Sequence, residues 1–278
     1  MNWDLWEFLR KKFSELGAPQ EAQWVYDEIA HLSGEEAHKK AQSILQLRKE
    51  NTPLAYIFGK WNFRGLDYSV GPGVLIPRPE TEELVDLALK APKKKSLKVI
   101  DLGSGTGVLG ISYALEAVSL GVESVELCLV ERSLDAFQYL KKNVDKHLIS
   151  SEKIKFKIFN LDWNKISKID FSNFDILFSN PPYISEEEYR LLDKGVTDFE
   201  PKEALLPSHN SWQAYVEILG MLDFLLAPGG RAYFEFGPAQ DEEGWKRLIP
   251  APYSGQIYKD LSGHPRMLEV FDTQAKSP

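Results

Sequence analysis

Short apolar runs alternate with longer amphipathic stretches over most of this 278-residue chain, and this alternation constrains the fold more than any other feature. The apolar runs cover 97–102, 124–130, 154–159, 174–179 and 232–236, and helical patterns cover 107–120, 133–148 and 211–226. Strands that alternate with helices indicate a parallel sheet with helices on both faces. The stretch 254–271 reads instead as two strands joined through Ser262-Gly263-His264-Pro265, which indicates an antiparallel edge. We therefore predict an α/β protein with a mostly parallel sheet.

The first part of the chain follows a different pattern. Residues 1–52 place apolar side chains at helical spacing in three segments, which predicts a small helical bundle. Residues 53–76 alternate apolar and polar side chains around Arg64-Gly65, which predicts a linking β-hairpin. We expect residues 77–278 to form the α/β domain.

Composition limits the class of protein further. The net charge of −8 is a poor match for a protein that binds phosphates through Lys and Arg, so we expect no direct nucleic-acid partner. The single cysteine, Cys128, lies in an apolar run and can form no intramolecular disulfide. The sequence has neither a run of about 20 apolar residues nor the pattern of a signal peptide. We therefore expect a cytoplasmic protein that does not bind membranes.

A glycine-rich turn follows the first predicted strand of the α/β domain. The residues of interest in "VIDLGSGTGVLG" are Asp101, Gly103, Ser104, Gly105, Thr106 and Gly107. Glycines at a strand–helix junction let the backbone bend tightly and approach a ligand, and ligands bind at this edge of open α/β sheets. The spacing matches neither the dinucleotide fingerprint nor the ATP-type P-loop. The carboxylate of Asp101 would repel a pyrophosphate but suits a cation such as S-adenosylmethionine.

Polar residues also follow the next two predicted strands. Glu131, after the second strand, can accept hydrogen bonds from ribose hydroxyls, although such an acid alone is more often a surface residue. After the third strand, Asp162 can accept from an adenine amino group, and the indole of Trp163 can lie against the base. A purely structural aromatic is the alternative for Trp163.

The fourth predicted strand ends in "SNPPYI", which contains Asn180, Pro181, Pro182 and Tyr183. The simplest reading is a strand stopped by proline. The prolines also fix two φ angles and leave backbone carbonyls without local donors, while Asn180 adds a side-chain acceptor. Together these acceptors can bind both hydrogens of an –NH2 group, and Tyr183 can form a flat wall beside it. No competing chemistry is evident, and the scattered histidines lack metal-ligand spacing, so we expect no metal.

These two motifs together resemble a class I S-adenosylmethionine-dependent methyltransferase of the Asn-Pro-Pro-Tyr type. The stretch "PLAYIFGKWNFRGLDYSVGPGVLIPRPETEELV", the N-terminal helices and "DFEPKEALL" are similar to the peptide chain release factor glutamine methyltransferases, the PrmC/HemK family. The resemblance covers nearly the whole chain. Two departures stand out: Glu131 replaces the Asp of many members, and 205–219 lacks their Gly-Gly-rich run.

The resemblance implies a Rossmann-like methyltransferase domain and a specific reaction. The family methylates the side-chain amide nitrogen, N5, of the Gln in the Gly-Gly-Gln tripeptide of class I release factors. Gly103 to Gly107, Glu131, Trp163 and Asn180 match the family's cofactor contacts, and Asn180 to Tyr183 match its glutamine-binding loop. S-adenosylhomocysteine would be the product, and we expect the N-terminal bundle to dock the release factor to a monomeric enzyme.

Two alternative substrates use the same loop chemistry. One is a Gln on a ribosomal protein, which closely similar enzymes methylate. The other is the N6 amino group of adenine in DNA or RNA, against which the acidic charge argues.

Overall fold

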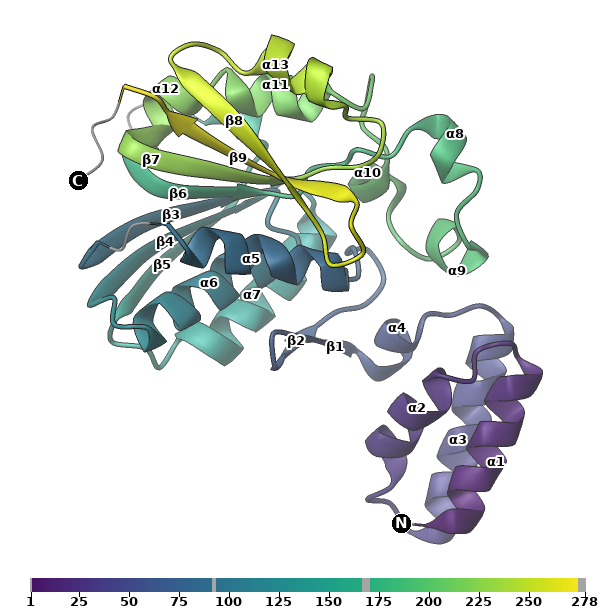
Figure 1. The fold of residues 1–278 in the computed structure, drawn as a ribbon. Coiled ribbons are helices and arrows are strands. Elements are labelled where there is room, and N and C mark those ends of the chain that lie inside the picture. The colour runs from purple at the N-terminus through teal and green to yellow at the C-terminus, as the bar shows by residue number, and fades with distance from the viewer. Residues whose placement is uncertain (1, 92–93, 167–170, 275–278) are drawn as a thin grey trace.

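The structure is a computed structural model that describes residues 2–91, 94–166 and 171–274. Three helices form the N-terminal bundle: α1 (Trp3–Glu15), α2 (Glu21–Ile29) and α3 (Gly34–Lys49). They enclose a separate apolar core that includes Leu5, Leu9, Phe13, Val25 and Ile44. The bundle, drawn in purple in Figure 1, lies to one side of the sheet, and the chain leaves it through the short helix α4 (Leu54–Phe58).

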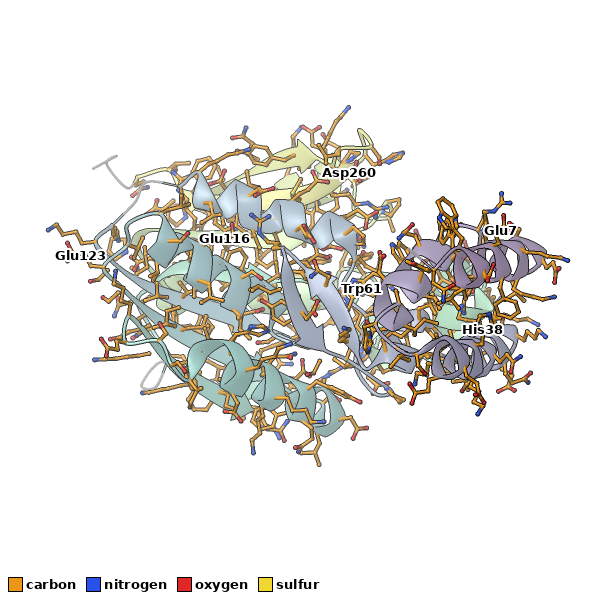
Figure 2. All side chains as sticks on the ribbon, turned by 90° about the horizontal axis from the view of Figure 1, so that it is seen from below. Glu7, His38, Trp61, Glu116, Glu123 and Asp260 are labelled. Carbon is orange, nitrogen blue, oxygen red and sulfur yellow. The ribbon has the colours of Figure 1, made fainter. Side chains whose placement is uncertain are left out.

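A two-stranded hairpin, β1 (Lys60–Phe63) and β2 (Leu66–Ser69), links the bundle to the larger domain. It is shorter than the sequence pattern suggests, because residues 54–58 are helical up to Gly59. Trp61 lies where the hairpin faces the bundle (Figure 2). It packs edge-on against Trp24 of the bundle, with ring centroids 6.0 Å apart. At the turn, Arg64 ion-pairs with Asp86 and Glu116, which fixes the hairpin to the helices of the larger domain.

Seven strands form the main sheet in the order β5-β4-β3-β6-β7-β9-β8. Their bounds are β3 (Ser96–Leu102), β4 (Ser124–Glu131), β5 (Ile154–Asn160), β6 (Phe174–Ser179), β7 (Leu226–Glu235), β8 (Tyr253–Lys259) and β9 (Pro265–Asp272). Strands β3 to β7 pair in parallel, whereas β9 runs antiparallel to both β7 and β8. The predicted α/β fold with an antiparallel edge is confirmed.

Helices cover both faces of this sheet (Figure 1). One face carries α5 (Glu82–Leu89), α6 (Val108–Ser119) and α7 (Leu134–Leu148), and the other carries α11 (Gln213–Leu219), α12 (Leu222–Leu225) and α13 (Glu242–Leu248). Successive strand residues point to opposite faces, so Val99 packs with the first layer of helices and Ile100 with the second. The remaining short helices are η1 (Pro79–Thr81), η2 (Trp163–Lys165), α8 (Glu186–Tyr189), α9 (Lys194–Thr197) and α10 (Lys202–Leu205).

The order of the strands creates a crevice. After β3, the next two strands join the sheet on one side, and the chain then returns to place β6 on the other side of β3. Adjacent parallel strands whose connections leave in opposite directions form a topological switch point, where α/β proteins bind their ligands. The carboxyl ends of β3 and β6 are Leu102 and Ser179, so both motifs singled out in the sequence lie at this point.

The helical pattern over 211–226 is wrong in its extent. Helix α11 ends at Leu219, with Gly220 as its C-cap, and Leu226 is already the first residue of β7. Met221 donates its backbone N–H to Ile218 at 3.0 Å, a tighter turn than an α-helix makes. Gly220 lies between α11 and α12, and glycine has a low helix propensity, which explains the break between the two helices.

Among the described residues, no helix has both the length and the apolar character that a membrane span requires.

Candidate active site

A cavity opens at the carboxyl ends of β3, β4 and β6. It is lined by Gly73, Val74, Leu75, Gly103, Gly105, Glu131, Arg132, Ser133, Ala136, Trp163, Asn180, Pro181, Pro182, Pro201, Glu203 and Ala204. Seven residues selected from the sequence are in this set. The other six residues selected from the sequence are not part of the lining: Asp101, Ser104, Thr106, Gly107, Asp162 and Tyr183.

The glycine-rich turn has the backbone that its composition predicts. Gly103, Gly105 and Gly107 have φ angles of 73°, 55° and 85°, in the left-handed region that favours glycine. A Cβ on Gly107 would also lie 2.7 Å from a methyl of Leu140 and 2.8 Å from one of Ile111. Side chains at these positions would strain the turn or displace the helices behind it.

Ser104 and Thr106 are buried and support the turn from behind. The hydroxyl of Ser104 donates to the carbonyl of Asp101 at 2.8 Å and accepts from the backbone N–H of Val130 at 3.0 Å. The carbonyl of Thr106 accepts from Nδ2 of Asn143 at 2.9 Å. Asn143 also bonds both backbone groups of Ser69, so it ties the glycine turn to the end of the hairpin.

Asp101 lies beneath the turn with 1% of its surface exposed. Its Oδ2 accepts from the backbone N–H of Gly110 at 3.0 Å, whereas its Oδ1 has no hydrogen-bond partner among the described residues. Burial raises the pKa of Asp101 to about 7, the bond from Gly110 opposes this rise, and the charge of Glu131 adds to it. A buried acceptor without a partner fits a site that receives a cationic group.

Glu131, the last residue of β4, lines the cavity and binds the turn at the same time. Its Oε2 accepts from the backbone N–H of Gly105 at 2.8 Å, and its Oε1 accepts from that of Ser133 at 2.7 Å. Burial raises its pKa, and both backbone bonds oppose the rise. Each carboxylate oxygen can accept a second hydrogen bond, so Glu131 retains capacity for hydroxyl donors.

Trp163 forms one wall of the cavity. A Cβ on Gly103 would lie 3.2 Å from its Cζ3, and its Nε1 donates to Glu217 at 2.7 Å, which fixes the plane of the indole. Asp162 instead lies in the adjoining hollow, where it accepts from the backbone N–H of Asn164 at 3.0 Å. The two residues therefore border different parts of the crevice.

The loop after β6 carries Asn180, Pro181 and Pro182 into the cavity lining. Nδ2 of Asn180 donates to the hydroxyl of Thr81 at 3.4 Å. Tyr183 is next in the loop but is not part of the lining, and its hydroxyl donates to Glu235 at 3.1 Å. Burial raises the pKa of Tyr183 above its usual value, and the charge of Glu235 adds to this.

Three residues next to the site were not selected from the sequence: Thr81, Asn143 and Glu235. Among the described residues, no group of three His, Cys, Asp or Glu side chains is arranged to hold a metal ion. The site thus offers hydrogen-bond acceptors, a buried carboxyl and an aromatic wall.

A doubly wound sheet with this turn and this loop at its switch point defines the class as a Rossmann-like methyltransferase of class I. Two solved structures have the same fold. A methyltransferase from Pyrococcus furiosus has a TM-score of 0.52 at 19% identity and covers 83% of this chain and 98% of its own. The catalytic domain of hMettl16, solved with the MAT2A 3'UTR hairpin 1, has a TM-score of 0.53 at 15% identity. The match covers 86% of this chain and 82% of the hMettl16 chain.

Sequence relatives narrow the class to one family. The release factor glutamine methyltransferase of Enterococcus faecalis is 32% identical over 258 residues, which are 92% of this chain and 88% of the relative. The one of Salmonella typhimurium is 34% identical over 225 residues, 81% of this chain and 77% of the relative. The family model described as Conserved hypothetical protein 95 matches residues 57–212. The chain belongs to the release factor glutamine methyltransferase family.

Proposed function

We propose that this protein transfers a methyl group from S-adenosylmethionine to the N5 amide nitrogen of the Gln in the Gly-Gly-Gln tripeptide of class I release factors. The observation that carries the proposal is that the glycine turn, Glu131 and the Asn180 loop border one cavity in a chain of this family.

The residues around the turn fit S-adenosylmethionine, which supplies an electrophilic methyl group on a sulfonium. Asp101 and the turn would hold the methionine part, because the unpartnered Oδ1 can accept from its ammonium. Glu131 would accept from the ribose hydroxyls. Trp163 would lie against the adenine, with Asp162 accepting from its amino group.

The Asn180 loop would hold the glutamine side chain. The side-chain oxygen of Asn180 and the carbonyl of Pro181 would accept the two hydrogens of the amide –NH2 group. An amide nitrogen is a weak nucleophile, because its lone pair is delocalised into the carbonyl. Acceptors that hold its hydrogens raise the electron density on nitrogen and orient it toward the methyl group. The ring of Tyr183 would pack beside the amide, held by its bond to Glu235.

We further propose three parts with separate roles: residues 1–52 dock the release factor, 53–76 link, and 77–278 catalyse, in a cytoplasmic monomer. The bundle has its own apolar core, and Lys60 of the hairpin ion-pairs with Glu28 of the bundle at 2.8 Å. These features support a docking module held at a fixed distance from the cavity.

Methyl-labelled S-adenosylmethionine tests the choice of substrate. We expect purified protein to label a class I release factor and to leave both a ribosomal-protein glutamine substrate and an adenine-containing oligonucleotide unlabelled. Label that appears only in the ribosomal protein or only in the oligonucleotide would overturn the proposal.

A further inference from the structure

A buried carboxylate lies directly behind the Asn180 loop. Glu235 is the last residue of β7, and Phe234 before it pairs with Ser179 of β6, so Glu235 is level with Asn180 across the sheet. Glu235 and Thr81 of η1 are each only 3% exposed. Three segments that are far apart in the sequence therefore meet at one point behind the cavity.

Both carboxylate oxygens of Glu235 are occupied by hydroxyl donors. Thr81 Oγ1 donates to Oε2 at 2.5 Å, and the Tyr183 hydroxyl donates to Oε1 at 3.1 Å. The backbone of Glu235 is also fixed, because its carbonyl accepts from the hydroxyl of Tyr215 at 2.8 Å. The position of the carboxylate thus determines where the two hydroxyl groups lie.

These bonds also set the polarity of the Asn180 side chain. A threonine hydroxyl has one hydrogen, and Thr81 uses it on Glu235, so its oxygen can only accept from Asn180. Nδ2 of Asn180 accordingly faces Thr81 at 3.4 Å, and the Oδ1 branch of the planar amide is left for the cavity that Asn180 lines. A long bond of this kind in a ligand-free site can tighten when substrate binds.

Burying the charged form of Glu235 costs free energy, because the carboxylate loses its contact with water. Burial raises the pKa of Glu235, the bonds from Thr81 and Tyr183 and the charge of Arg266 oppose the rise, and the charge of Glu80 adds to it. Within the described ranges, no Lys or Arg nitrogen forms an ion pair with Glu235. Replacing a buried polar group together with its hydrogen-bond partners by apolar groups of the same shape can leave stability nearly unchanged, so stability alone does not explain why a carboxylate lies here.

We propose that Glu235 and Thr81 are positioning residues for methyl transfer. Glu235 orients the Thr81 hydroxyl, which directs the Oδ1 acceptor of Asn180 toward the substrate amide, and it also holds the ring of Tyr183. The proposal rests on the proposed function, since it assigns the role of Asn180 in that reaction. It also gives Thr81, within the segment "PRPETE", a chemical role.

The variants Thr81→Val and Thr81→Ser separate the hydroxyl from the shape of the side chain. T81V keeps the branched shape without the donor, and T81S keeps the donor. With release factor as substrate, we expect T81V and Glu235→Gln to lower kcat about 10- to 100-fold with little change in cofactor affinity, and T81S to stay near wild type. Glu269→Gln is the control for the loss of a buried carboxylate, because Glu269 on β9 accepts from Tyr233 and Tyr258 and ion-pairs with Arg231, all outside the site.

Three results would overturn the positioning role while the wild type is active: T81V with wild-type kcat, T81V and T81S with equal losses, or E269Q with a loss as large as that of E235Q. A wild type that leaves the release factor unmethylated refutes the proposed function instead. A measurement on the ligand-free protein then still decides the positioning role. The side-chain ¹⁵N–¹H signals of Asn180, assigned by their loss in N180D, should move in T81V and stay in T81S; unchanged signals in T81V refute it.

Discussion

Asp101 should make the stability of the ligand-free protein depend on pH near neutrality. Burial raises its pKa from 3.8 to about 7, so between these values the folded protein binds a proton that the unfolded chain releases. The free energy of unfolding is therefore not lowered by Asp101 below pH 3.8. It falls progressively between pH 3.8 and about 7 and stays at the lower value above this range. The loss amounts to about 4 kcal/mol in all, of which about 3 kcal/mol develops between pH 5 and pH 8.

Asp101→Asn removes this titration and nearly preserves the shape. The asparagine oxygen can keep the bond from Gly110, now 3.0 Å long, while its –NH2 group replaces the unpartnered Oδ1. Urea unfolding at pH 5 and pH 8 measures the difference in unfolding free energy between D101N and wild type. We expect this difference to shift in favour of D101N by about 3 kcal/mol between the two pH values.

The affinity for the cofactor should depend on pH in the opposite direction from the stability of the ligand-free protein. A cationic ligand favours ionised Asp101, so wild-type affinity for S-adenosylmethionine should rise from pH 6 to pH 8, whereas D101N should bind weakly and without this dependence. Calorimetric titration at both pH values measures it. Parallel unfolding free energies of the two proteins from pH 5 to pH 8 would refute the account of Asp101.

Other substitutions test separate parts of the account. Asn180→Ala should keep cofactor affinity within a few fold and lower methyl transfer about 100-fold, because the amide loses its orientation; unchanged turnover would exclude the role. Arg64→Ala should lower the unfolding free energy by about 2–4 kcal/mol, because the bonds between its guanidinium and acids such as Glu116 tie the hairpin to the sheet domain; an unchanged urea midpoint would contradict this. Trp163→Phe should weaken S-adenosylmethionine binding about tenfold with little change in kcat, because the indole loses its bond to Glu217 and part of its stacking area; wild-type affinity would remove Trp163 from the adenine site.

The parts of the site that the sequence predicts are those at the ends of strands. Gly103 and Asn180 follow apolar runs that form β3 and β6, and parallel strands bring their carboxyl ends to one edge. Sequence position alone was therefore enough to place them together.

The parts that the sequence does not predict depend on contacts across long separations. Thr81 and Glu235 meet although they are 154 positions apart in the sequence, and no local pattern indicates that contact. One signal was present: Glu235 is an acid inside the apolar run "AYFEF", where burial requires a partner. The start of β7 at Leu226 was missed for another reason, because Pro228-Gly229-Gly230 is typical of a turn.

Mass spectrometry of the release factor tests the central claim most directly. Purified protein, S-adenosylmethionine and a class I release factor are incubated together, and the peptide that contains Gly-Gly-Gln is fragmented. We expect one methyl group on the side-chain amide of that Gln, and about 100-fold slower formation of this product with N180A. A peptide without the methyl group after incubation with active wild-type protein, or a methyl group on a different residue, would contradict the account.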